Sequence, residues 1–133
     1  MASGIKSGLS DSGWIEATLG SNFKDYTDSG TPAVTTKYRR VGNFVNIIGC
    51  VSPKSALTIN TDNRFTITTL PEGFRPTKPV YEICQGSTQN VWMLTVNTTG
   101  DVTLGRYRMI NASSYTNCPA GAWLPFSVFF EVV

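Results

Sequence analysis

The stretch RFTITTLPEGFRPTKPVYEICQG, residues 64–86, decides the class of fold. It contains two short runs rich in β-branched and aromatic residues, at 64–69 and 79–85. Residues 70–76 separate the runs with two prolines and a glycine. Runs of this length and composition, bounded by proline and glycine, are typical of β-strands. The stretch therefore predicts two strands joined by a proline-rich loop.

The loop between these strands has features that a plain turn does not need. Pro71 and Pro76 fix their own φ angles and push the preceding residues towards extended backbone, while Gly73 permits a bend. We expect Phe74 to turn back into the core as an anchor. We expect Arg75 to pair with a carboxylate or with carbonyl groups. These features assign the loop to architecture, with ligand binding at its tip as the alternative.

Strand-like runs of the same kind recur along the chain, and no segment shows clear helical periodicity. We expect further strands at 14–19, 35–42, 43–51, 55–59, 90–97, 101–109 and 122–133. Many short strands separated by Gly, Pro, Asn, Asp and Ser predict an all-β, antiparallel sandwich, which we expect to be jelly-roll-like. The length of 133 residues suits one domain. We assign 13–133 to a single sandwich and 1–12 to a linker.

Two connections between the expected strands are specific. Residues 97–101 (NTTGD) place a glycine between two alternating runs, which predicts a hairpin with a short loop. Gly42 and Asn43 both tolerate positive φ, so they predict either a tight turn or a bulge within one long strand.

The alternation of side chains predicts which faces of two strands are buried. Along 45–51, the odd-numbered positions share one face and the even-numbered positions the other, and both faces are largely apolar. Along 123–132, the even-numbered positions form an apolar row, and the mixed odd-numbered row includes Phe129. A single sandwich core does not use an outward-facing phenylalanine. We expect either another subunit or a covering loop to bury it.

Composition disfavours several classes of partner. The net charge of +2 rests on only 15% charged residues, a weak surplus for a nucleic-acid-binding domain. The basic residues that do cluster lie within expected strands, so they would project from a sheet rather than form a basic arm: Lys37, Arg39, Arg40, Arg106 and Arg108. No apolar run approaches the roughly 20 residues needed to cross a bilayer, so we expect no membrane insertion.

The residues that usually carry enzymatic or metal chemistry are scarce. The chain has no histidine, which removes Ser-His and Cys-His pairs and histidine metal sites. The three cysteines, Cys50, Cys84 and Cys118, form no CxxC motif, and their odd number suggests reduced thiols rather than a disulfide framework. We therefore expect no enzyme, cofactor or metal site. A wall-polymer hydrolase would need two converging carboxylates, which the sequence does not pair.

Four segments, in this order, resemble C-terminal modules of phage tail-tip, baseplate, receptor-binding and tail-fibre proteins, especially of phages that infect Gram-positive bacteria. They are 13–15 (GWI), 37–43 (KYRRVGN), 69–76 (TLPEGFRP) and 96–102 (VNTTGDV). The most specific part is KYRRVGN followed by TLPEGFRP. The resemblance covers residues 13 to about 130.

The resemblance implies a compact β-sandwich that assembles as a homotrimer at the tip of a virion tail, after assembly in the host cytoplasm. Such modules commonly bind host cell-wall polysaccharide, while related ones are structural adaptors that hold other baseplate or tail proteins. Exposed aromatic side chains beside Asn or Asp in the 109–123 loop would favour saccharide binding. An exposed apolar patch without such polar groups would favour an adaptor.

Saccharide binding needs an aromatic platform for the C–H faces of a sugar and planar polar groups for its hydroxyls. The longest polar loop, 109–121, is where such residues gather, because binding residues concentrate on loops mounted on a rigid sheet. The candidate saccharide contacts are Asn111, Tyr115, Asn117, Trp123 and Trp92. The alternatives are that Tyr115 plugs the end of the sandwich and that Trp92 belongs to the core or to a subunit interface.

Overall fold

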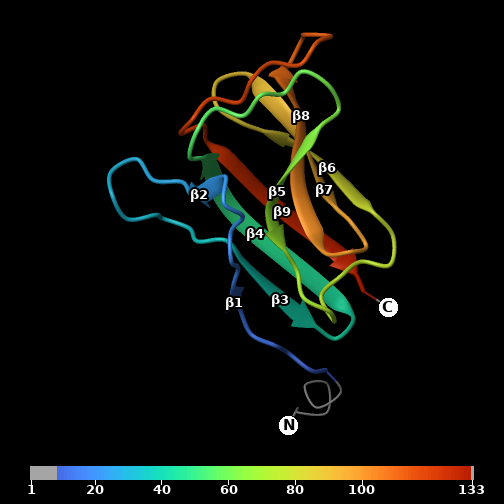
Figure 1. Cartoon of the computed structure of the whole chain (residues 1–133). Coiled ribbons are helices and arrows are strands. Elements are labelled where there is room, and N and C mark those ends of the chain that lie inside the picture. Colours follow the sequence, from blue (N-terminus) through green and yellow to red (C-terminus); the bar gives the residue numbers. More distant parts are fainter. Residues whose placement is uncertain (1–8, 133) are drawn as a thin grey trace.

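The computed structural model describes residues 9–132 and is all-β, as the sequence predicts (Figure 1). Nine strands form two antiparallel sheets within these residues. The strands are β1 (Ile15–Glu16), β2 (Phe23–Asp25), β3 (Lys37–Val41), β4 (Phe44–Pro53), β5 (Arg64–Thr69), β6 (Val80–Gln85), β7 (Asn90–Val96), β8 (Asp101–Met109) and β9 (Leu124–Glu131). No helix in this part of the chain is long and apolar enough to cross a membrane.

The five-stranded sheet is organised around β4, its longest strand. β9 pairs with one side of β4 from Phe44 to Val51, while β3 and then β2 pair with the other side. β1 adds to the outer edge of β3. The two-residue turn Gly42-Asn43 joins β3 to β4, so the expected turn is confirmed.

The four-stranded sheet has the order β5-β8-β7-β6. Three consecutive strands, β6, β7 and β8, are neighbours, and β5 lies beside β8. This is Greek-key connectivity, the unit from which jelly rolls are also built. The β7–β8 hairpin closes through hydrogen bonds between Asn97 and Asp101 and between Gly100 and Asn97, which confirms the predicted short loop.

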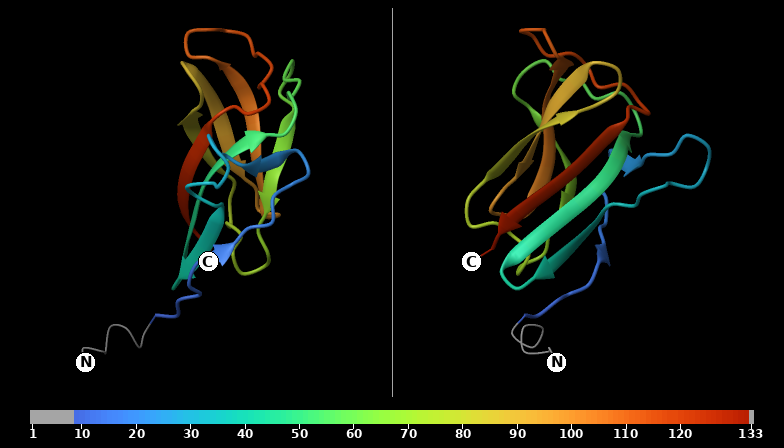
Figure 2. Two further views of the ribbon diagram at one scale, coloured as in Figure 1. Left: turned by 90° about the vertical axis from the view of Figure 1, so that its left-hand side faces the viewer. Right: turned by 180° about the vertical axis from the view of Figure 1, so that it is seen from behind.

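The two sheets pack face to face and also meet at their edges (Figure 2). At one edge, Leu19 forms an isolated bridge with Thr68 of β5, and the Thr68 hydroxyl donates to the Thr18 carbonyl at 2.6 Å. At the other edge, β6 lies against β9. The sandwich is thus closed along both sides.

The predicted alternation of faces is confirmed in β4 and β9. The odd-numbered side chains of 45–51 and the even-numbered side chains of 124–130 are buried between the sheets. From the other sheet, the core receives Trp92, Leu94, Val96, Val102, Leu104 and Tyr107. The Trp92 ring meets Phe126 edge to face at 6.1 Å between centroids, so one apolar layer joins the sheets.

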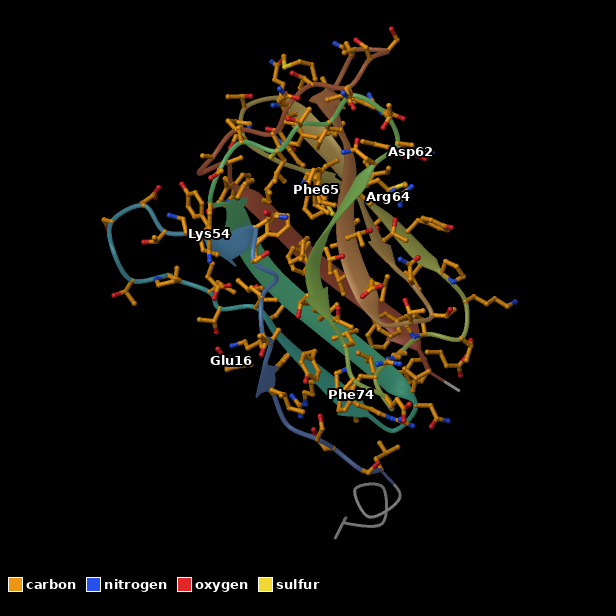
Figure 3. All side chains as sticks on the ribbon, viewed as in Figure 1. Glu16, Lys54, Asp62, Arg64, Phe65 and Phe74 are labelled. Carbon is orange, nitrogen blue, oxygen red and sulfur yellow. The ribbon has the colours of Figure 1, made fainter. Side chains whose placement is uncertain are left out.

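The loop at 70–76 has the predicted architectural role. Phe74 packs against the core and meets Tyr38 edge to face at 5.0 Å, at the lower end of the sandwich in Figure 3. The Arg75 Nε donates to the Leu70 carbonyl at 2.9 Å, which settles its partner as a carbonyl rather than a carboxylate. The Leu70 N–H in turn donates to the Gly100 carbonyl at 2.8 Å and ties the loop to the β7–β8 turn.

The structure differs from the prediction at four places. The strand expected at 14–19 is reduced to Ile15–Glu16. β2 was not expected, because its three residues are too few to show a period in the sequence. The strand expected at 55–59 is absent, and Leu57 instead makes an isolated bridge with Cys118. Of the expected linker, residues 1–8 lie outside the described residues. Ser10 and Ser12, in contrast, bond to the backbone of Gly42 and Arg40.

Candidate functional site

The outer face of the four-stranded sheet carries a cleft of about 370 Å³ at the end nearest the 109–121 loop. We name it the arginine cleft. Strands β6, β7 and β8 form its floor and the loop forms its wall. Its lining residues are Ile83, Val91, Trp92, Met93, Arg106, Arg108, Ala112, Ser113 and Tyr115.

A local irregularity in β8 shapes this cleft. The pairing of β7 with β8 shifts register between Val91 and Met93, so β8 carries an extra residue opposite β7. Arg106 lies in this bulge with φ of 54°, an uncommon value for a residue other than glycine. Because Val102 and Leu104 before the bulge and Tyr107 after it all belong to the core, the bulge turns Arg106 and Arg108 to the outer face, where both line the cleft.

Arg106 belongs to a network of ion pairs around Asp62. The Asp62 carboxylate accepts two hydrogen bonds from Arg106, at 2.9 Å from Nε and 3.2 Å from Nη2. Asp62 also accepts from Arg64 at 3.4 Å, and both residues lie at the start of β5 (Figure 3). The hydrogen bond from Arg106 lowers the pKa of Asp62, so the carboxylate stays ionised at a lower pH than an ordinary aspartate does.

The absence of a side chain at Gly105 allows Arg64 to cross the sheet. A Cβ at Gly105 would lie 2.8 Å from the Arg64 Cδ, closer than side-chain atoms approach. Across this gap, the Arg64 Nη1 donates to the Thr95 hydroxyl of β7 at 2.6 Å. Arg64 therefore links β5 to β7 beside the cleft, whereas Arg106 and Arg108 line the cleft itself.

Arg108 has a different environment from Arg106. It is half-buried, and its Nη1 donates to the carbonyl groups of Ile110 and Ala112 at 3.2 and 3.4 Å. Among the residues that the structure describes, no carboxylate forms an ion pair with it. Arg108 thus supports the wall of the cleft through neutral acceptors and keeps its full charge.

The structure places two of the five predicted contacts in the cleft. Tyr115 is half-buried and lines it, and it also packs against the core, which agrees with the alternative that it plugs the end of the sandwich. Trp92 lines it as well but is only 1% exposed, and its ring packs in the core, so it presents no face on which a sugar can stack. This matches the core position given as the alternative for Trp92.

The other three predicted contacts do not line the cleft. Asn111 is exposed on the loop, and the side-chain oxygen of Asn117 accepts from the Ile59 N–H at 3.0 Å, a bond that joins two loops. Trp123 is 41% exposed, and its backbone N–H donates to the Ser87 hydroxyl at 2.7 Å. Sequence reasoning missed Arg106 and Arg108 as site residues. Their alternation within one expected strand was the signal that they share a face.

A second surface lies on the outer face of the five-stranded sheet. We name it the aromatic patch, formed by Leu9, Trp14, Val41, Phe44 and Phe129. The Phe44 and Phe129 rings stack in parallel with 5.2 Å between centroids. Phe44 is nevertheless 45% exposed and Phe129 63% exposed. They border a shallow hollow of about 590 Å³ whose lining is mostly apolar. The outward-facing position expected for Phe129 is confirmed.

An ion pair borders the aromatic patch. Arg39 donates to both carboxylate oxygens of Asp11, from Nε at 2.9 Å and from Nη2. The Arg39 guanidinium and the Lys37 ammonium lie 5.8 and 5.6 Å from the centre of the Trp14 ring, within cation–π distance. The patch therefore has a charged side beside β1 and an apolar centre over β4 and β9.

Within residues 9–132, no group of three Cys, Asp or Glu side chains is placed to hold a metal ion. Among the same residues, no carboxylate lines the arginine cleft. The converging carboxylates that a glycosidase mechanism requires are not brought together there.

Comparison with known proteins leaves the resemblance as a prediction. No protein-family model matches the chain, and no curated protein matches it.

Proposed function

We propose that this chain is a receptor-binding module of a phage tail that attaches the virion to a cell-surface saccharide of its bacterial host. The arginine cleft is the proposed site. The observation that carries the proposal is that one cleft is lined by Tyr115, by two arginines and by the apolar residues of its floor. Its volume lies in the lower part of the range for small-ligand sites.

The chemistry of the cleft suits a sugar. A pyranose ring offers C–H faces, which pack against aromatic and aliphatic side chains such as Tyr115, Ile83 and Met93. Its hydroxyl groups are acceptors as well as donors, and Arg106, Arg108 and Ser113 supply donors around the rim. The polar neighbours of Tyr115 are thus arginine and serine, rather than the Asn or Asp anticipated from the sequence.

The position of the cleft also agrees with display at a tail tip. The described chain starts at the lower end of the sandwich in Figure 1, while the 109–121 loop forms the upper end. Both views in Figure 2 show the same separation. A segment that joins the tail before residue 9 would leave the cleft near the end of the sandwich opposite the attachment point.

A glycan array tests this proposal directly. We expect the wild-type protein to bind one class of bacterial surface saccharide and Tyr115→Ala to lose roughly five- to thirtyfold in affinity, since a stacking platform contributes about 1–2 kcal/mol. Tyr26→Ala is the matched control, because Tyr26 lies outside the cleft and bonds to Asp28. Equal binding by both variants would contradict the assignment of the cleft.

We further propose that the aromatic patch is the subunit interface of a homotrimer. Its two stacked and exposed rings give it the apolar centre that such interfaces have. The patch also favours the second candidate function, a structural adaptor whose patch is covered by another baseplate or tail protein. A monomer that binds no saccharide would support the adaptor, and a trimer that binds one would support the receptor-binding module.

A further inference from the structure

We infer that the saccharide recognised by the arginine cleft carries an anionic substituent, a carboxylate or a phosphate, which binds Arg108. This inference rests on the proposed function and narrows its ligand to acidic saccharides. It is argued from the hydrogen-bonding character of the cleft, from the partners of its two arginines and from its apolar walls.

The polar side chains of the cleft are predominantly donors. Arg106 and Arg108 can only donate, and the hydroxyl groups of Ser113 and Tyr115 can donate as well as accept. No carboxylate or side-chain amide of the described residues supplies an acceptor in the lining. Each hydroxyl of a neutral sugar carries an O–H donor besides its acceptor lone pairs, and these donors would find no carboxylate or amide acceptor among the side chains of the lining. An anionic group presents acceptors alone and matches it.

Arg108 is the arginine whose charge is available to bind an anion. Only its Nη1 has hydrogen-bond partners among the described residues, and both partners are neutral carbonyl groups. Its half-buried position limits how well water can solvate the charge. A bidentate bond from a guanidinium to a carboxylate or phosphate is about twice as strong as a neutral hydrogen bond, and it would satisfy this group.

Arg106 plays a different part. Its Nε and Nη2 are both engaged by Asp62, which offsets its charge. The pair leaves the cleft with a net positive charge from Arg108 while holding Arg106 at the rim. An anion that enters therefore meets Arg108 without a competing carboxylate in the lining.

The apolar part of the lining strengthens this electrostatic match. Ile83, Val91 and Met93 lie along the floor, opposite the loop that carries Tyr115. A sugar ring packed against these side chains excludes water from the space around Arg108. Charge pairs gain strength when water is excluded, because the local dielectric constant falls.

The test uses an array of matched glycosides: neutral hexosides, the corresponding hexuronates and the corresponding hexose phosphates, with inorganic phosphate as a soluble competitor. Wild type is compared with Arg108→Gln, which keeps a polar side chain but removes the charge. Lys78→Gln is the control, because Lys78 is an exposed loop residue outside the cleft and also loses one positive charge. Near-ultraviolet circular dichroism confirms that each variant is folded.

We expect acidic glycosides to bind at least tenfold more tightly than their neutral partners, and Arg108→Gln to abolish this preference. Lys78→Gln should retain it. Uronate and phosphate arms then identify which acidic group the cleft prefers.

Equal binding of neutral and acidic glycosides, unchanged in Arg108→Gln, would overturn this inference and leave the proposed function intact. Binding of neither class would overturn both. Inorganic phosphate that binds as tightly as the hexose phosphates would show a general anion site and would also overturn the inference, because it would remove the role of the sugar.

Discussion

Replacing Phe129 with aspartate tests whether the aromatic patch holds subunits together. Phe129 is 63% exposed in the single chain and stacks on Phe44. A phenylalanine presents about 200 Å² of surface, so covering the exposed part would bury roughly 130 Å². At about 25 cal/mol per Å², this burial contributes about 3 kcal/mol per subunit contact. The loss corresponds to about two orders of magnitude in the association constant.

The assay is size-exclusion chromatography with light scattering. We expect wild type at three times the chain mass of 14.5 kDa and Phe129→Asp at the mass of one chain. Tyr81→Asp is the matched control, because Tyr81 is 60% exposed but lies on the other sheet. Circular dichroism of each variant separates dissociation from unfolding.

Two results would refute this reasoning. A wild-type protein that stays monomeric at the highest concentration tested would remove the trimer and leave the patch for another partner. A Phe129→Asp trimer, or dissociation by Tyr81→Asp alone, would place the interface elsewhere on the sandwich.

Three further predictions concern the folded chain itself. Gly100→Ala should lower the free energy of unfolding, measured by urea denaturation, by about 3 kcal/mol. Gly100 has φ of 94°, and an added Cβ would lie 2.3 Å from the Leu70 carbonyl oxygen. Unchanged stability would contradict this. The hydrogen bond from Arg39 lowers the pKa of Asp11 from 3.8 to about 2, so its stabilisation is complete above pH 3.8 and is lost as the pH falls through 2. An NMR titration of the Asp11 carboxyl group checks this, and Arg39→Gln should return the pKa towards 3.8. The Cys118 thiol is fully buried, and burial raises its pKa to about 12. A thiol reagent should therefore modify Cys118 only as fast as the protein opens. Rapid modification of Cys118 in the native protein would count against this.

Much of the fold could be predicted from the sequence because the strands have strong local signals. The alternation in 45–51 and 124–130 determined which faces are buried, since side chains on a strand must alternate. The prolines of 70–76 predicted the rigid loop, and the structure adds its anchor at Tyr38. β2 gave no such signal, because its pairing with residues 51–53 of β4 depends on the rest of the sheet being in place.

The candidate site could be predicted only in part. The loop that carries Tyr115 was identified by its polar composition, and Tyr115 lines the cleft. The contribution of Arg106 depends on a bulge in β8 and on Asp62 from a distant loop, neither of which has a local pattern. Asn117 was predicted from its residue type, and its side chain instead bonds to the backbone of Ile59. Pairings of this kind arise from tertiary structure alone.

The pairing of β4 with β9 has a consequence for how the protein is made. β4 is central to its sheet, but most of its length, from Phe44 to Val51, pairs with β9, which the ribosome synthesises last among the described strands. Before β9 is available, one edge of β4 is unpaired in the nascent chain and the core lacks the side chains that β9 contributes. Loop closure over most of the sequence must precede this pairing, which slows folding of β-sandwiches to milliseconds or seconds. Folding is therefore completed only after synthesis of β9, and until then the unpaired edge of β4 is a site at which chains can aggregate.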